Sequence, residues 1–82
     1  MMSKVCSNLM RLQNFIHDRN IDDSSIISAG ASQYEAALHL QCEELLRITD
    51  GENLQDFTDN SSYAHRGLEM EGVRVHAIFQ KK

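Results

Sequence analysis

Residues 32–49 decide the fold and read SQYEAALHLQCEELLRIT. Ser32 and Glu35 have the spacing of a capping box, in which a serine hydroxyl accepts an amide hydrogen of the first helical turn and the glutamate reaches back to the serine amide. Gly51, shortly beyond, is a typical helix stop. We therefore predict an amphipathic helix from Ser32 to about Thr49. Its apolar face consists of residues at helical spacing: Tyr34, Ala37, Leu38, Cys42, Leu45 and Ile48.

The outward face of this predicted helix is acidic, and its apolar surface is wide. Leu40 and Leu46 lie on opposite flanks, beyond the stripe that a single packing contact needs. They either pack inside a small core or contact another chain. Together with the acidic face they form a candidate partner-binding surface. The candidate residues are Glu35, His39, Leu40, Glu43, Glu44, Leu46 and Asp50.

A first helix is predicted near the start of the chain. Ser3 is a typical N-cap, and the apolar spacing continues to about Asp18. Asn20 follows, and asparagine tolerates the left-handed conformation found beyond helix ends. The apolar stripe of this helix contains Val5, Leu9, Leu12 and Ile16, with Phe15 on one flank.

The segments on either side of the central helix carry weaker signals. Capping residues predict a short helix from about Asp23 to Ala29, before Gly30. Residues 51–62 are mostly polar and predict a connecting loop or a short extra strand.

The last twenty residues fit a β-hairpin that turns at Glu71-Gly72. This register pairs Met70 with Val73, and it places the opposite charges of Glu69 and Arg74 across from each other. A C-terminal helix is the alternative, but each of two internal glycines would cost it about 1 kcal/mol. The fold class is therefore α+β: one small domain over residues 1–82, with two main helices and a short helix before the hairpin. The alternative is an all-α domain.

The second strand of that hairpin is predicted to form an exposed sheet edge. Unpaired backbone groups at an edge can pair with a second copy of the chain, which predicts a possible site of homodimer formation. The residues of this predicted edge are Val73, Val75 and Phe79.

The composition indicates a cytoplasmic protein. Hydrophobic residues make up 41% of the 82-residue chain, which is enough for a core. Cys6 and Cys42 lie far apart, whereas a secreted domain of this size usually carries several disulfides. We find no apolar run with the length of a signal peptide or a membrane span.

Catalytic and metal-binding motifs are weak in this sequence. Its four glycines are scattered and do not form a phosphate-binding loop. Glu35, His39 and Glu43 recur every four residues, but a solvated charge ladder explains that spacing, and zinc needs three or four converging ligands. We therefore expect no enzymatic activity, no cofactor and no bound metal.

Charge distribution distinguishes two functional hypotheses. The net charge is −4, and residues 31–60 hold one arginine against seven acidic residues. We expect a non-enzymatic protein-interaction module, such as a small regulator, adaptor or inhibitor of the kind that phages and mobile elements encode. Its acidic helical surface would meet a basic partner.

The alternative is a winged-helix-like transcriptional regulator, because three helices followed by a hairpin match that element order. The acidic third helix would repel DNA phosphates. In this alternative the hairpin would supply the basic contacts, which are Arg66, Arg74, Lys81 and Lys82.

Overall fold

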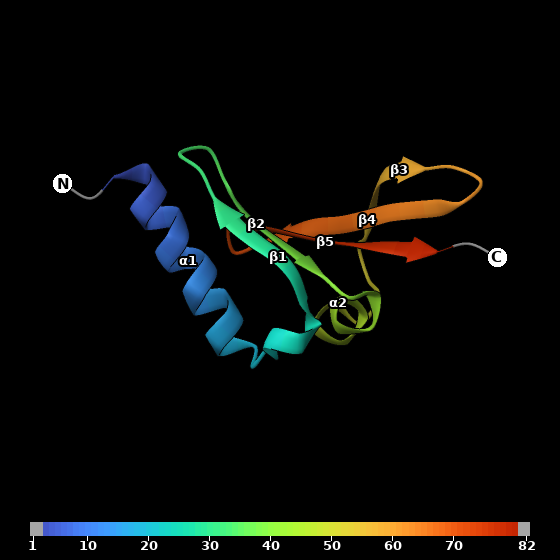
Figure 1. The fold of residues 1–82 in the computed structure, drawn as a ribbon, viewed down its shortest axis with the longest axis horizontal. Helices are drawn as coiled ribbons and strands as arrows, with labels where there is room; N and C mark the ends of the chain where they lie inside the picture. The colour runs from blue at the N-terminus through green and yellow to red at the C-terminus, as the bar shows by residue number, and fades with distance from the viewer. Residues whose placement is uncertain (1–2, 81–82) are drawn as a thin grey trace.

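The computed structural model describes residues 3–80, which form a small α+β domain with strands dominating the C-terminal half (Figure 1). Two helices, one 3-10 turn and five strands follow each other along these residues. They are α1 (Lys4–Asp18), η1 (Asp23–Ser25), β1 (Ile26–Ala31), β2 (Ala36–Leu40), α2 (Cys42–Thr49), β3 (Gln55–Asp59), β4 (Tyr63–Met70) and β5 (Val73–Gln80). No helix in this range is long and apolar enough to cross a membrane.

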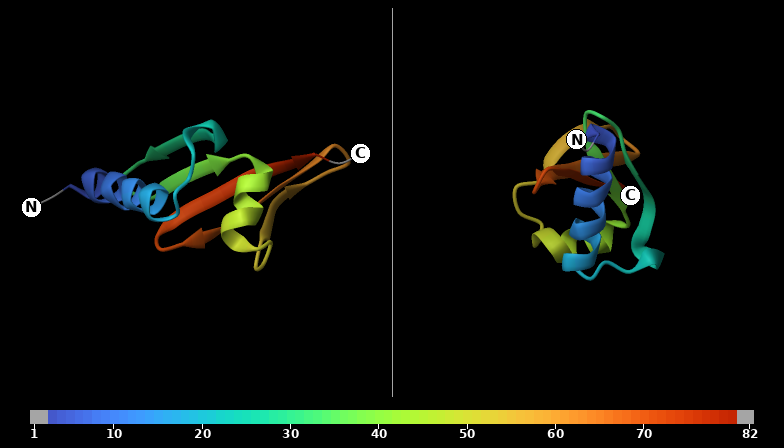
Figure 2. Two further views of the ribbon diagram at one scale, coloured as in Figure 1. Left: turned by 90° about the horizontal axis from the view of Figure 1, so that it is seen from below. Right: turned by 90° about the vertical axis from the view of Figure 1, so that its left-hand side faces the viewer.

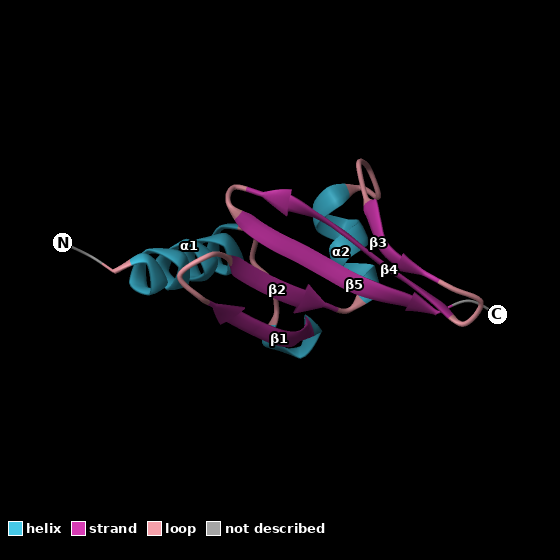
Figure 3. Cartoon of the chain, turned by 90° about the horizontal axis from the view of Figure 1, so that it is seen from above, coloured by secondary structure: helices cyan, strands magenta, loops and turns pink. Residues whose placement is uncertain are grey.

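The five strands form one mixed sheet in the order β1-β2-β5-β4-β3 (Figure 3). The β1–β2, β5–β4 and β4–β3 pairs are antiparallel, whereas β2 and β5 are parallel. In the parallel pair, Ala36 to His39 lie opposite Val73 to His76. The sheet therefore consists of two antiparallel units that join at its centre.

Both helices pack on one face of this sheet. In Figure 2 (left) α1 and α2 lie on the near side of the strands, and Figure 3, seen from the opposite side, has the sheet in front of α2. The core between these layers is aliphatic, with one aromatic ring from α1. Its residues are Leu12, Phe15, Ile21, Ala36, Leu38, Leu40, Leu45, Val73, Val75 and Ala77.

The predicted helix over residues 32–49 is wrong in its first half. The Ser32 hydroxyl accepts the amide hydrogens of Tyr34 and Glu35 at 3.1 and 3.2 Å, and the Ser32 amide donates to the Glu35 carbonyl at 2.8 Å. These bonds close the β1–β2 turn. Serine caps a helix and a turn through the same side chain-to-backbone hydrogen bonds, so the local signal did not distinguish them.

The remainder of that segment divides into a strand and a shorter helix. Ala36, Leu38 and Leu40 are fully buried and alternate with half-buried residues, which is the pattern of a strand with one covered face. Helix α2 begins only at Cys42 and ends at Thr49, where Asp50 adopts a left-handed conformation with φ of 55°.

Two further segments differ from the predicted pattern. The short helix expected from Asp23 is reduced to η1, and the chain continues as β1. Residues 51–62 contain β3, so the extra strand, rather than a simple loop, is the correct alternative.

Helix α1 and the C-terminal hairpin form as predicted. The Ser3 hydroxyl accepts the Cys6 amide hydrogen at 3.1 Å, and Asn20 is left-handed with φ of 53°. Met70 pairs with Val73 in the hairpin, as the predicted register requires.

The predicted edge is wrong for Val73 and Val75. β5 pairs with β4 along its whole length, and its residues 73–76 also pair with β2 on the other side, so both valines are fully buried. Phe79 is half-buried and lies beyond the residues that pair with β2. The edges of the sheet are β1 and β3. The error follows from the β2 misassignment, because a helix at that position leaves β5 without its second neighbour.

Leu40 and Leu46, which the sequence analysis assigned to one partner-binding surface, differ in burial. Leu40 is fully buried, whereas Leu46 is 42% exposed. We expect Leu40→Ala to lower the free energy of unfolding by about 2–5 kcal/mol, because it leaves a cavity in the core. Leu46→Ala should change it by about 0.5 kcal/mol or less. Urea titrations followed by circular dichroism measure both, and equal losses would contradict this assignment.

Candidate functional site

The face of the sheet opposite the helices, called the open face below, is the candidate functional site. Strand alternation identifies its members, because the neighbours of each core residue point the other way. Neither α1 nor α2 covers these residues. They include Ala37, His39, His65, Gly67, Glu69, Arg74, His76 and Ile78.

Three histidines from three adjacent strands meet on this face, and they form the histidine cluster: His39 from β2, His76 from β5 and His65 from β4. The His39 and His76 rings stack with centroids 4.7 Å apart. His65 Nε2 lies 2.9 Å from His76 Nδ1, so one of these two nitrogens carries the shared hydrogen. His39 therefore contacts the pair through its ring plane, while the pair itself is hydrogen-bonded.

Gly67 makes this close approach possible. It pairs directly with His76 across the β4–β5 ladder. A Cβ atom on Gly67 would press against the Val75 carbonyl oxygen and would lie 2.8 Å from His76 Cα. Without that atom, the His76 ring reaches across to His65, two residues along β4.

The environment keeps two of the three imidazoles neutral. Burial, followed by the charges that His39, His65 and Arg74 would present, lowers the pKa of His76 from 6.5 to about 4, and Glu35 only partly opposes this shift. Burial, and then His65, also lowers the pKa of His39. At neutral pH the centre of the open face is therefore polar but carries no charge at these two side chains.

A phenylalanine and an ion pair lie beside the cluster. Phe57, at a register shift in β3, packs edge-on against His65 with centroids 5.4 Å apart and is 40% exposed. The Arg74 guanidinium lies 5.5 Å from the Phe57 ring centre, and its Nε is 3.7 Å from a Glu35 carboxylate oxygen. An aromatic centre with a charged rim is the arrangement common at protein–protein contacts.

The cluster is not arranged around a common metal position. Within residues 3–80, no group of three histidine, cysteine or acidic side chains is placed to hold a metal ion. His65 and His76 direct nitrogens at each other, which commits them to a hydrogen bond. His39 Nε2 is buried, and we find no hydrogen-bond partner for it in the described part of the chain.

The structure disperses the partner-binding residues expected from the sequence. Glu35 lies at the β1–β2 turn and His39 on the open face, whereas Leu40 is in the core and cannot contribute to a surface. The other four lie on the helix side of the sheet, on α2 or just after it: Glu43, Glu44, Leu46 and Asp50. The Glu44 side chain is only 9% exposed and pairs with Arg47.

The basic residues of the winged-helix alternative are also separated. Arg74 is on the open face, but Arg66 pairs with Asp56 at 2.7 Å on β3. Lys81 and Lys82 lie outside the described residues. The predicted third helix is largely a turn and a strand, so residues 3–80 do not form the helix-turn-helix arrangement on which that alternative depends.

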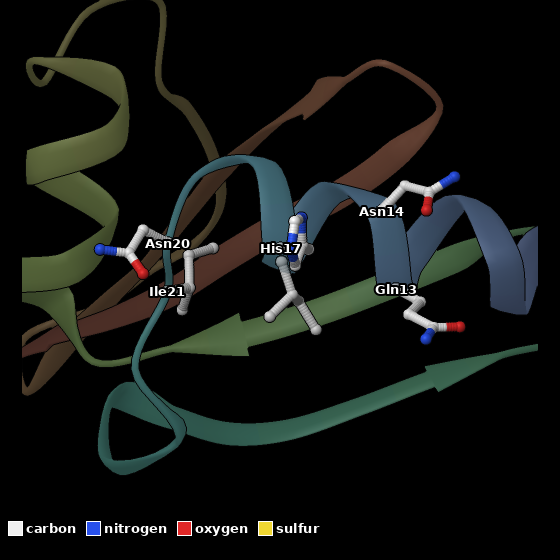
Figure 4. Close-up of a pocket in the computed structure, with 6 residues that line it drawn as sticks. Gln13, Asn14, His17, Asn20 and Ile21 are labelled. Carbon is white, nitrogen blue, oxygen red and sulfur yellow. The ribbon is translucent and has the colours of Figure 1, made fainter.

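The helix side carries a shallow pocket of about 600 Å³ at the C-terminal end of α1 (Figure 4). Gln13 and His17 line it from the helix, and Ile21 lines it from the following segment. His17 is near Asp18, with a nitrogen–oxygen distance of 3.6 Å, and its side chain is 88% exposed. Such exposed polar groups form a weaker candidate site than the histidine cluster.

No family model, curated protein or solved structure matches this chain. The candidate site therefore rests on the geometry of the open face.

The sequence analysis did not identify His65 and His76 as site residues. The hairpin register was correct and placed Gly67 opposite His76, from which the proximity of His65 follows. The hairpin register does not bring His39 to this pair, because the position of His39 beside His76 depends on the β2–β5 pairing.

Gly67 offers a direct test of this geometry. Gly67→Ala should destabilise the fold by more than about 1 kcal/mol, because the new methyl group meets backbone atoms that are fixed in the ladder. Gly30→Ala is the matched control, since a Cβ there has no neighbour within 4 Å. We expect it to be neutral or slightly stabilising. Urea midpoints that fall equally in both variants would contradict the close approach.

The histidine cluster predicts a loss of stability at mildly acidic pH. Above pH 6.5 the His76 ring is neutral in both folded and unfolded chains, so its contribution to stability is complete. Between pH 6.5 and about 4 the His76 ring binds a proton in the unfolded chain but not in the folded chain. The free energy of unfolding therefore falls as the pH falls.

Urea unfolding at about pH 7.5 and about pH 5 measures this change. His76→Gln should flatten the fall, whereas His17→Gln, which removes an imidazole remote from the cluster, should leave it in place. A wild-type midpoint that is the same at both pH values would contradict the prediction.

Proposed function

We propose that this protein is a non-enzymatic protein-interaction module, a small regulator, adaptor or inhibitor, that binds its partner through the open face. The observation that carries the proposal is the uncovered sheet face with its cluster of His39, His65, His76 and Phe57. Ile78 adds an aliphatic side chain that is 43% exposed. The function class is the one expected from the sequence, but the proposed surface moves from the acidic helix to the sheet.

The shape of the molecule supports a binding role. The principal extents of 48 × 24 × 21 Å describe an elongated molecule with helices on one side of its sheet. A partner on the open face would cover the exposed Phe57 and Ile78 side chains and the half-buried imidazoles beside them.

The charge pattern favours a protein partner over a nucleic acid. Phosphate binding draws on clustered lysine and arginine. On the open face Arg74 is close to Glu35. Arg66 lies opposite the core residue Ala77, on the other face, and is already paired with Asp56. The whole chain carries −4. Affinity would therefore come from the aromatic and aliphatic centre, with the Arg74–Glu35 rim selecting the partner.

The test compares two faces of the molecule. A double variant, Phe57→Ser with Ile78→Ser, removes the exposed apolar groups of the open face. The matched control, Leu46→Ser with Glu43→Lys, alters the exposed surface of α2. Affinity capture from the native cell with mass spectrometry first identifies proteins held by the wild-type chain. Calorimetry with the purified partner then measures each variant.

We expect the open-face variant to weaken binding at least about thirtyfold, the equivalent of about 2 kcal/mol for the loss of a central anchor. The α2 variant should bind as the wild type does. Loss of binding only in the α2 variant would return the function to the acidic helix. Circular dichroism at the assay temperature checks that both variants are folded.

A further inference from the structure

We propose that two copies of this chain associate through β1, pairing their β1 strands in antiparallel orientation to form one continuous sheet. The surface involved is the edge of β1 with the adjoining flank of α1. It is separate from the histidine cluster, so the inference does not rest on the proposed function.

The two edges of the sheet differ in charge. Strand β1 reads IISAGA and contains no charged residue. Strand β3, the other edge, carries Asp56 and Asp59. Charged side chains protect an edge against pairing with another strand, because like charges would face each other across the new ladder. Of the two edges, β1 lacks this protection.

The free edge of β1 presents backbone N–H and C=O groups at regular intervals. Ser32 and Glu35 form a hydrogen-bonded pair at the turn, and antiparallel ladders alternate such pairs with non-bonded ones. This alternation directs the backbone groups of Ala29 and Ala31 away from β2. A two-fold axis near Ala29 would place these groups opposite their equivalents, and the residues next to that axis, 28–31, all have small side chains.

Helix α1 contributes an apolar flank on the same side. Arg19 bonds to Glu71 at 2.8 Å, and Arg11 lies against Gly72, so one flank of α1 faces the β4–β5 turn. At 100° per residue Leu9 lies about 160° around the helix from Arg11.

Leu9 therefore points to the side of α1 near β1, and Val5 precedes it by one turn. These two side chains are 48% and 39% exposed, and Ile27 of β1 is 52% exposed. The sequence pattern placed Val5 and Leu9 in the stripe that packs on the core. Instead Asn8, Leu12 and Phe15 are the buried residues of α1.

A second copy is the occupant that fits this surface. An uncharged, small-residue strand is complementary to itself in antiparallel pairing, and the two-fold axis brings the apolar flanks of two α1 helices to the same interface.

Light scattering over a range of protein concentrations tests the association. The wild-type chain should have about twice the 9.3 kDa mass of one copy. Ala29→Lys should reduce the mass to that of one copy, because two ammonium groups would meet near the axis. Leu9→Lys, a second variant on the helix flank, should weaken the dimer independently. Both positions are exposed, so circular dichroism should be unchanged.

Controls locate the interface. Thr58→Lys places the same charge on the β3 edge and should remain dimeric. Hydrogen exchange should show protected amides in residues 26–31 of the wild type and faster exchange in Ala29→Lys. A wild-type chain with the mass of one copy at every concentration would overturn the proposal, and so would a dimer that survives Ala29→Lys. The open-face variant Phe57→Ser with Ile78→Ser should stay dimeric. The experiment therefore distinguishes a failure of the β1 dimer from a failure of partner binding through the open face.

Discussion

The parallel pairing of β2 with β5 is the constraint on which the rest of the structure depends. It joins the β1–β2 hairpin to the β3–β4–β5 unit at the centre of the sheet. Leu38 and Val75 lie opposite each other in this pair and are fully buried beneath the helices. Because a parallel pair needs a long connection, α2, β3 and β4 all lie between the two strands in the chain. The helix layer and the open face are both positioned by this pair.

Local signals were sufficient for the parts of the fold that close locally. The N-cap at Ser3 and the left-handed Asn20 bounded α1 correctly, and alternation with a glycine turn gave the β4–β5 register. Residues 32–40 were misread because Ser32 bonds to nearby amides in a turn as it would in a helix. The alternation of Leu38 and Leu40 was a usable strand signal, but these residues become a strand only by pairing with β1 and with the distant β5.

The candidate site also depends partly on local signals and partly on distant strand pairing. The hairpin register already brought His65 close to His76, whereas His39 joins them through the parallel pair. The acidic surface expected on one helix is divided between the two sides of the sheet, since Glu35 and His39 precede α2 and belong to the β1–β2 hairpin. Burial against neighbouring rings, rather than any motif, gives His76 its lowered pKa. Such a property depends on tertiary packing.

The central position of β5 also has a consequence for synthesis of the protein. On the ribosome, the four other strands emerge before residues 73–80, yet β2 and β4 each need β5 as a neighbour. Until β5 emerges, Leu38 and Leu40 lack the valines that complete their layer of the core. The nascent chain therefore holds two unjoined hairpin units with exposed apolar faces, and the domain closes only after its central strand has been made.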